Sequence, residues 1–241
     1  MLLQPVLRKH SIKLGRDGLF DLLREFGLLV KLKRYKHYTT DSKHQFYKYP
    51  NQIKDKQVNK SNQLWVSDIT YIPLKERFAY LFLITDAYSR KIVGFHLSDD
   101  MKVSSAIVAL QKALHQKPPE TIVIHHSDRG IQYCSTAYVE LLQKNNALIS
   151  MTQSGDPLEN AIAERVNGIL KTELFSRYYD NIDIASMHIA RCITIYNYKR
   201  RHSSLNWQIP DRVHSQQGPQ IKKWKNYYKT KKLKQLTMNE P

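Results

Sequence analysis

Three acidic residues, Asp68, Asp128 and Glu164, stand apart in the sequence, with 59 and then 35 residues between them. We expect the first two at strand ends and the third within a helix. Carboxylates brought together by a fold supply hard, anionic oxygen ligands, which suit Mg²⁺ or Mn²⁺ better than the softer metals that prefer thiolate or imidazole. In a basic protein such a site favours phosphodiester chemistry.

Other interpretations of these acids stay open at this point. Asp68 alternates with apolar residues in Trp65–Tyr71, and a salt bridge to a nearby cation would also explain it. Glu164 shares a polar helix face with three neighbours, and such a face is often only solvated. Two close carboxylates repel unless a cation lies between them. Five other acids are typical of turns, helix caps or surfaces: Asp86, Asp99, Asp100, Glu159 and Glu173. Among them Asp86 is the strongest competitor for a place in the site, because it ends a central strand.

The residues around the second and third acids narrow the possibilities. His125 and His126 are adjacent on a strand and point to opposite faces, so at most one reaches the site, and a core role is expected for them. At about 100° per residue, the predicted helix around Glu164 places three further polar side chains on the same face. These are Asn160, Asn167 and Lys171.

Net charge indicates the partner. The 241 residues carry a net charge of +17, with a pI near 9.7, which favours a polyanion such as nucleic acid. Residues 1–60 hold 14 basic and 5 acidic groups, residues 61–211 are nearly balanced with 16 and 15, and residues 212–241 hold 8 and 1. Basic ends are often solvated tails, but here aromatic residues alternate with the lysines, as in segments that stack on bases and contact phosphates.

Cysteine usage and hydropathy set the expected compartment. Cys134 and Cys192 are the two cysteines, and there is no CxxC pair or zinc-like cluster. No signal peptide is indicated, and no run approaches 18 apolar residues. We expect a cytoplasmic, nucleoid-associated protein with reduced thiols.

Periodicity predicts an α/β fold with basic extensions. A helix is expected at 17–26 within a partial helix-turn-helix-like region, 1–39, followed by a linker, 40–61. The core, 62–214, is predicted to hold a five-stranded mixed sheet flanked by helices, and 215–241 a basic tail. The expected strands are 64–74, 78–87, 91–97, 121–126 and 148–151, and the expected helices are 103–115, 135–144, 158–175 and 184–197.

Four sequence blocks resemble the DDE transposases of bacterial insertion sequences, specifically the second reading frame of the insertion-sequence-three family, whose core is similar to retroviral integrases. Three blocks surround the acids: Trp65–Tyr71, His126–Tyr133 and Glu159–Glu173. The fourth runs from Tyr196 to Leu205 and is followed by Pro210. The resemblance covers about 62–214.

The resemblance implies a ribonuclease-H-like core in which Asp68, Asp128 and Glu164 bind two divalent ions, Mg²⁺ or Mn²⁺, for in-line attack on phosphorus. Lys171 resembles the family's lysine that meets donor DNA near the scissile phosphate. Further DNA contacts are expected from the same helix face and from the fourth block, at Asn160, Asn167, Arg200, Arg201 and His202.

The leading hypothesis is therefore a transposase that nicks element ends and transfers the strands, acting on double-stranded DNA as a homo-multimer. Two departures from the family pattern are present: Glu159 stands where many relatives have Asp, and 1–60 holds only part of the usual helix-turn-helix module. A truncated, catalytically idle DNA-binding copy is the alternative, as is a product made with an upstream reading-frame partner or as a fusion. A ribonuclease H acting on RNA–DNA hybrids shares the metal chemistry but does not explain the basic ends.

Overall fold

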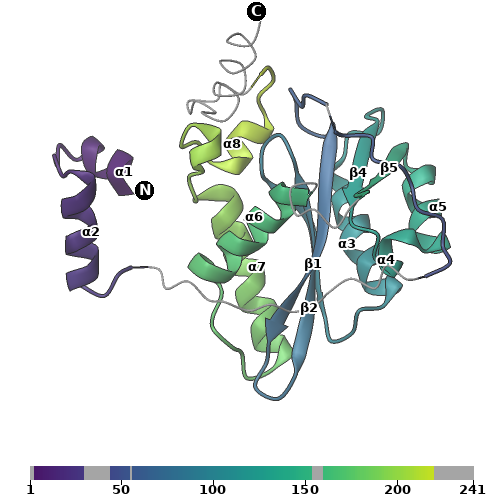
Figure 1. The fold of residues 1–241 in the computed structure, drawn as a ribbon, viewed down its shortest axis with the longest axis horizontal. Coiled ribbons are helices and arrows are strands. Elements are labelled where there is room, and N and C mark those ends of the chain that lie inside the picture. The colour runs from purple at the N-terminus through teal and green to yellow at the C-terminus, as the bar shows by residue number, and fades with distance from the viewer. Residues whose placement is uncertain (1–2, 30–43, 55, 154–159, 220–241) are drawn as a thin grey trace, which may run out of the picture.

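The computed structural model describes residues 3–29, 44–54, 56–153 and 160–219. Near the N-terminus lie two short helices, α1 (Leu3–Lys9) and α2 (Arg16–Glu25) (Figure 1). The helix predicted at 17–26 is confirmed as α2, whereas α1 was not predicted. Much of the segment after α2 and nearly all of the predicted tail, 30–43 and 220–241, lie outside the described residues.

A five-stranded mixed sheet forms the centre of the core, as predicted. Its order is β3-β2-β1-β4-β5, with β1 (Leu64–Pro73), β2 (Phe78–Asp86) and β3 (Ile92–Ser98) antiparallel. β4 (Val123–Ser127) pairs parallel with β1, and β5 (Ala147–Met151) pairs parallel with β4. The first and fourth strands are therefore neighbours, as the β-α-β pattern requires.

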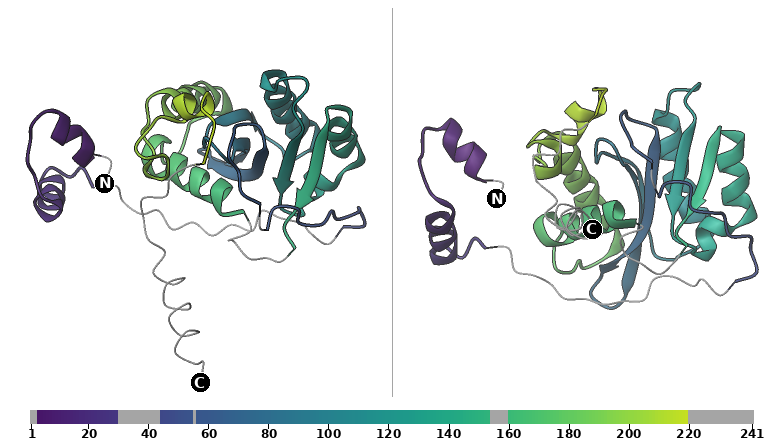
Figure 2. Two further views of the ribbon diagram at one scale, coloured as in Figure 1. Left: turned by 90° about the horizontal axis from the view of Figure 1, so that it is seen from above. Right: turned by 45° about the horizontal axis from the view of Figure 1, so that its top comes forward.

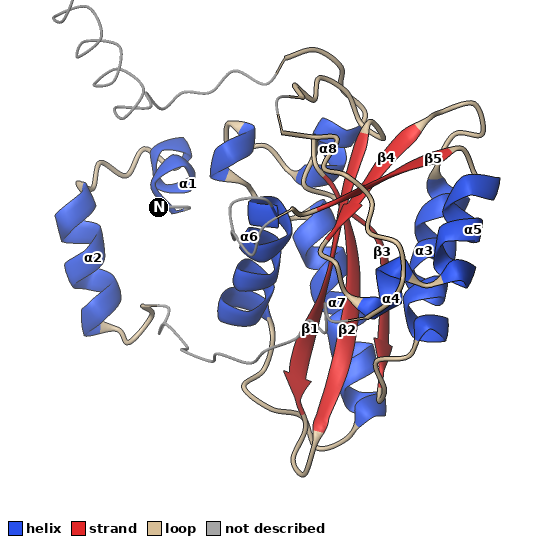
Figure 3. Cartoon of the chain, turned by 45° about the vertical axis from the view of Figure 1, so that its right-hand side comes forward, coloured by secondary structure: helices blue, strands red, loops and turns tan. Residues whose placement is uncertain are grey.

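Helices cover both faces of this sheet (Figures 1 and 2). On one side lie α3 (Val103–Gln116), α4 (Ile131–Cys134) and α5 (Thr136–Lys144). The other side holds α6 (Ala161–Ile169), the π-helical turn η2 (Leu170–Leu174) and α7 (Ile182–Tyr198), followed by η3 (Ser203–Leu205) and α8 (Pro210–His214) (Figure 3). Within the described ranges, no helix combines the length and apolar character needed to cross a bilayer.

Two expected elements differ in detail. The loop predicted at 127–134 contains the single-turn helix α4. The helix predicted to reach 175 leaves α-helical geometry after Ile169, where the Phe175 N–H bonds to the Leu170 carbonyl at 2.8 Å, a five-residue π-type step. Beside it the Thr172 hydroxyl donates to the Gly168 carbonyl at 2.7 Å, and such hydroxyl bonds compete with the regular ladder.

Each face of the sheet carries its own hydrophobic core. Trp65, Phe82 and Leu110 belong to the cluster under α3 to α5, and Leu81 and Tyr196 to the cluster under α6 and α7; all five are at most 1 % exposed. Each such side chain contributes about 1.5–3 kcal/mol of burial free energy. Because both faces are covered, the strands appear in the sequence as nearly continuous apolar runs.

The described part of the predicted linker lies against the core. His44 Nε2 is 2.8 Å from the Arg129 carbonyl, and the Gln52 backbone N–H donates to Ser150 Oγ at 2.9 Å. Tyr49 packs against the α3–α5 cluster, and Ile53 contacts a small cluster that includes Val66 and Ala163. This segment therefore crosses the surface beside β4 and β5.

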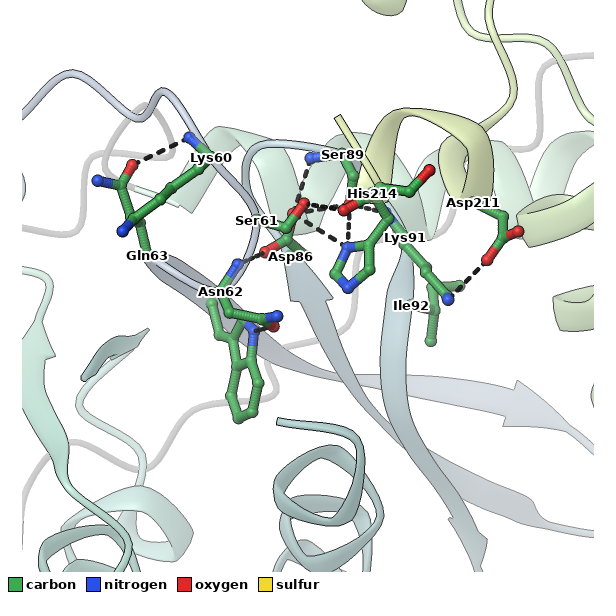
Figure 4. A network of polar contacts seen from close by, with 12 residues as sticks. Lys60, Ser61, Asn62, Gln63, Asp86, Ser89, Lys91, Ile92, Asp211 and His214 are labelled. Carbon is green, nitrogen blue, oxygen red and sulfur yellow. Dashed lines mark hydrogen bonds and ion pairs between the residues drawn. The ribbon is translucent and has the colours of Figure 1, made fainter. Parts of the chain in front are cut away.

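Asp86 organises the end of the sheet where the chain enters and leaves the core (Figure 4). Its side chain is 0 % exposed and accepts hydrogen bonds from the Asn62 N–H, the Ser89 N–H and the Ser89 hydroxyl, each at 2.7 Å. His214 of α8 joins through Nδ1, 2.9 Å from Ser89 Oγ and 3.7 Å from Asp86 Oδ1. This confirms a turn role for the strongest competitor among the acids.

Candidate active site

The pairing of β1 with β4 brings the first two acids together. Val66 pairs with His126 in parallel register, so continuing the register by two residues sets Asp68 beside Asp128. Neighbouring strands lie about 4.8 Å apart. After β4 ends, the Asp128 carboxylate accepts the Gly130 N–H at 3.0 Å, which holds the loop at the strand end.

Two asparagines fasten α6 to β1 on either side of Glu164. Asn160 Nδ2 donates to the Ser67 carbonyl at 3.0 Å, and Asn167 Nδ2 donates to Asp68 Oδ2 at 2.6 Å. Glu164 is four residues after the first and three before the second, so all three share one helix face. This face therefore directs Glu164 toward the side of β1 that carries Asp68, while the Glu164 side chain stays exposed.

Charge and burial together perturb Asp68. Burial is the largest cause and raises the pKa of Asp68 to about 7, with the negative charge of Asp128 adding to it and Glu164 contributing a smaller increase. The hydrogen bonds from Asn167 and from the Ile69 backbone act in the opposite direction. The charges of Asp128 and Glu164 thus both act on Asp68, as expected if the three acids share a site.

The donor set fits a hard divalent cation, although the carboxylates are not gathered around one point. Among the described residues no group of three His, Cys, Asp or Glu side chains has the spacing that holds a metal ion. The side-chain oxygens of Asn160 and Asn167 are buried there without a hydrogen-bond partner in the described chain. Carboxylates that repel one another and buried amide oxygens without partners fit a hard divalent cation. The metal-ligand role of Asp68, Asp128 and Glu164 stays a prediction.

Replacing Asp68 with Asn tests this electrostatic description. The pKa of the Asp68 carboxyl is higher in the folded protein than in the unfolded chain. Such a group destabilises the folded protein progressively as the pH increases from the pKa of the unfolded chain toward 7. We therefore expect Asp68→Asn to stabilise the metal-free protein at pH 8 by on the order of 1–3 kcal/mol, and much less at pH 4. Thermal unfolding in EDTA at both pH values measures this, with the exposed Asp180→Asn as control. Equal effects of Asp68→Asn at the two pH values would contradict it.

Both histidines before Asp128 belong to the core, as expected. His125 is 1 % exposed, with Nε2 2.7 Å from Ser67 Oγ and 3.0 Å from the Tyr138 hydroxyl. Burial lowers the pKa of His125 to about 3. His126 is 0 % exposed, and its Nδ1 is 2.9 Å from Ser150 Oγ.

Lys171 lies between the acids and a cavity. It occupies η2, and burial lowers the pKa of its ammonium group while the charge of Asp68 raises it. The same side chain lines a cavity of about 240 Å³ whose walls include Tyr71, Phe78 and Arg177. Aromatic and cationic side chains together are typical of surfaces that bind nucleic acid, and the DNA contact of Lys171 stays a prediction.

The other predicted DNA contacts have structural partners. Arg200 makes a two-pronged ion pair with Glu173, with both N···O distances 2.8 Å, and Arg201 Nη1 donates to the Trp207 carbonyl at 3.2 Å. His202 is only 4 % exposed and lies 3.2 Å from the Tyr196 hydroxyl, which favours a structural role. Contact with DNA remains a prediction for Arg200 and Arg201, and for Asn160 and Asn167.

Two residues that follow Asp128 are explained only by the structure. Gly130 has ordinary backbone angles, φ −64° and ψ 145°, and its importance is space, because a Cβ there would lie 3.0 Å from Asp128 Oδ1. Arg129 Nε is buried without a partner in the described chain. In the sequence, the signal for both roles is that the two residues directly follow Asp128.

Comparisons with known proteins match this geometry. Residues 58–157 and 145–210 each match a family described as Integrase core domain. An insertion element IS600 31 kDa protein of Shigella sonnei is 37 % identical over 206 residues, covering 84 % of this chain and 76 % of its own length. The transposase for insertion sequence element IS904 of Lactococcus lactis is 34 % identical, covering 85 % of this chain and 82 % of its own.

Solved structures share the fold. A chain of the simian T-cell lymphotropic virus intasome in complex with PP2A regulatory subunit B56 gamma superposes with a TM-score of 0.58 at 19 % sequence identity. The match covers 76 % of this chain and 65 % of that chain. The HTLV-2 integrase catalytic core domain in complex with magnesium superposes with a TM-score of 0.50 at 17 % sequence identity. The match covers 64 % of this chain and 97 % of that chain. The core thus has the predicted ribonuclease-H-like fold.

Proposed function

The chain belongs to the transposases of bacterial insertion sequences, which are DDE-type polynucleotidyl transferases, and from that premise we propose that Asp68, Asp128 and Glu164 cut and join DNA at element ends. The observation that carries the proposal is the double attachment of α6 to β1, through Asn160 and Asn167, on the helix face that holds Glu164. That attachment supports a site built from three oxygen donors on three separated segments of the chain.

The three carboxylates would hold divalent cations, Mg²⁺ or Mn²⁺, and two such ions supply an activated water or 3′-hydroxyl nucleophile and a stabilised leaving 3′-oxygen. The protein's own contribution is positioning. Asn167 fixes Asp68, and the Gly130 N–H fixes Asp128, so both carboxylates are held before DNA arrives. Lys171 offers a positive charge to the phosphate beside Asp68.

We further propose that DNA is the substrate and that a homo-multimer is the active form. The proposed division of the chain is 1–39, 40–61, 62–214 and 215–241. The charge distribution supports DNA, because the excess of basic residues lies outside the core. The idle DNA-binding copy gains no support from the site, since a protein that only occupies DNA has no use for carboxylates that repel one another. A ribonuclease H remains the competing enzyme, because it shares the metal chemistry.

A nicking assay tests the function. The full chain is incubated with Mg²⁺ and either an end-labelled element-end duplex or an RNA–DNA hybrid, with Asp128→Asn as the inactive control. Nicking of the duplex that leaves a 3′-hydroxyl, followed by joining to target DNA, supports the transposase. Cutting of the hybrid alone would support the nuclease instead, and binding without cutting in Mg²⁺ or Mn²⁺ would support the idle copy.

A further inference from the structure

The segment that precedes β1 contacts the turn that follows Asp128. In Figure 1 residues 44–54 form the dark blue trace that passes β5. His44 is the first described residue of this segment, and its Nε2 is 2.8 Å from the carbonyl oxygen of Arg129, the residue after Asp128. A carbonyl oxygen only accepts hydrogen bonds, so the Nε2–H of His44 is the donor.

The carbonyl that His44 contacts belongs to the peptide unit between Arg129 and Gly130. The N–H of that same unit donates to the Asp128 carboxylate at 3.0 Å. A peptide unit is planar and rigid, and in the trans form its C=O and N–H point in opposite directions. Fixing the carbonyl therefore also fixes the direction of the N–H. In addition, a hydrogen bond at the carbonyl polarises the unit and strengthens its N–H as a donor.

The other end of the segment is attached to the strands that lead to Asp128. The Gln52 backbone N–H donates to Ser150 Oγ at 2.9 Å, and the Gln52 side-chain amide donates to the Ile149 carbonyl at 3.0 Å. Ser150 Oγ is in turn 2.9 Å from Nδ1 of His126, which lies two residues before Asp128. Residues 44–54 are thus connected to the chain both before and after Asp128.

Packing alone does not explain a histidine at position 44. The residue is half-buried, and its Nδ1 is fully buried without a hydrogen-bond partner in the described chain. The Phe46 ring lies beside it, with the two ring centroids 5.6 Å apart. A buried nitrogen without a partner costs free energy, which an apolar side chain of similar size would avoid. The bond to the Arg129 carbonyl is what the histidine supplies in return.

We propose that His44 is a positioning residue for Asp128, acting through the Arg129–Gly130 peptide. His44 holds the peptide carbonyl, the peptide N–H holds the Asp128 carboxylate, and a carboxylate restrained by such a partner binds a metal ion more tightly. This rests on the proposed function, because it takes Asp128 as a metal ligand. It makes residues 44–54 a part of the catalytic unit.

Three variants of the full chain test the proposal. His44→Phe keeps a ring beside Phe46 but removes the donor, whereas His44→Gln supplies an amide N–H at a similar distance from the backbone. Gln52→Ala is the matched control, because it removes a side-chain bond at the other end of the segment and leaves His44 intact.

Single-turnover nicking of an element-end duplex in Mg²⁺ gives the first comparison. We expect His44→Phe to lower the rate about tenfold, as when a hydrogen-bond partner of a metal ligand is removed, with duplex affinity unchanged. His44→Gln should recover most of the rate, and Gln52→Ala should stay within about twofold of the wild type.

Amide hydrogen exchange in EDTA, followed by mass spectrometry, gives a second comparison that needs neither metal nor activity. The peptide that contains Gly130 should exchange about 5- to 10-fold faster in His44→Phe than in the wild type, because a turn opens more easily when it loses a hydrogen bond. In His44→Gln and Gln52→Ala the same peptide should exchange at nearly the wild-type rate.

Four results would each overturn the proposal: wild-type nicking by His44→Phe, no recovery in His44→Gln, an equal loss in Gln52→Ala, or faster exchange spread over the whole chain of His44→Phe. Failure of the proposed function gives a different pattern. Wild-type protein that nicks no duplex, together with faster exchange confined to the Gly130 peptide in His44→Phe, would overturn the proposed function while confirming that His44 holds the turn.

Discussion

Glu164→Gln is expected to lower the rate of Mg²⁺-dependent nicking by at least about 10³-fold, equivalent to about 4 kcal/mol of transition-state stabilisation. The substitution keeps the size of the side chain and the helix but removes one of three anionic oxygen donors. Because Glu164 is exposed and the asparagines that fasten α6 are untouched, the fold and DNA binding should remain. Single-turnover nicking of an element-end duplex measures the rate, and a gel-shift assay measures binding.

Glu140→Gln is the matched control for Glu164→Gln, since Glu140 is an exposed glutamate on α5, on the other side of the sheet. Its rate should stay within about twofold of the wild type, as is usual for a surface substitution away from a site. If Glu164→Gln nicks DNA as fast as Glu140→Gln, Glu164 is no ligand, and a three-acid mechanism is excluded.

Asp86→Ala is expected to destabilise the protein by about 3–5 kcal/mol. The Asp86 carboxylate is fully buried and connects the start of β1, the β2–β3 turn and α8. Its loss leaves the backbone N–H groups of Asn62 and Ser89 without hydrogen-bond acceptors. Urea unfolding of the full chain measures the free energy. The mechanism is structural, so any residual folded fraction should keep its activity.

The neighbouring pair Lys91 and Asp211, visible in Figure 4, supplies the control for Asp86→Ala. Their charged atoms are 2.7 Å apart, but the Asp211 side chain is 39 % exposed. A partly exposed ion pair contributes about 0–1 kcal/mol, so Asp211→Asn should cost little. A cost of Asp211→Asn as large as that of Asp86→Ala would show that burial is not what makes Asp86 important.

Much of this arrangement was predictable because it follows from local pattern. The apolar runs gave all five strands, and the β-α-β order made the first and fourth strands neighbours, which is why Asp68 and Asp128 were expected to meet. Helical periodicity placed Asn160, Glu164 and Asn167 on one face. The structure adds that the side-chain amides of Asn160 and Asn167 form hydrogen bonds with β1. Periodicity does not predict these bonds, because it does not indicate what a helix face contacts.

Other features depend on tertiary contacts with no local signature. The π-helical turn at Leu170–Leu174 ends the α-helix without a proline or glycine at the break. The fourth sequence block was expected to contact DNA through His202, yet that side chain is buried, and Asn197 instead bonds both the N–H and the carbonyl of Ile92 on the edge strand β3, at 2.9 Å each.

A titration with Mn²⁺ tests most directly whether the three acids bind cations. The full chain, bound to an element-end duplex, is titrated with Mn²⁺ while the electron paramagnetic resonance signal of the free ion is followed, with Asp68→Asn and Glu164→Gln in parallel. We predict that the wild type takes up Mn²⁺ and that each variant binds it at least about tenfold more weakly, since each removes an anionic ligand. Equal uptake by all three proteins, or none by the wild type, would contradict the proposed site.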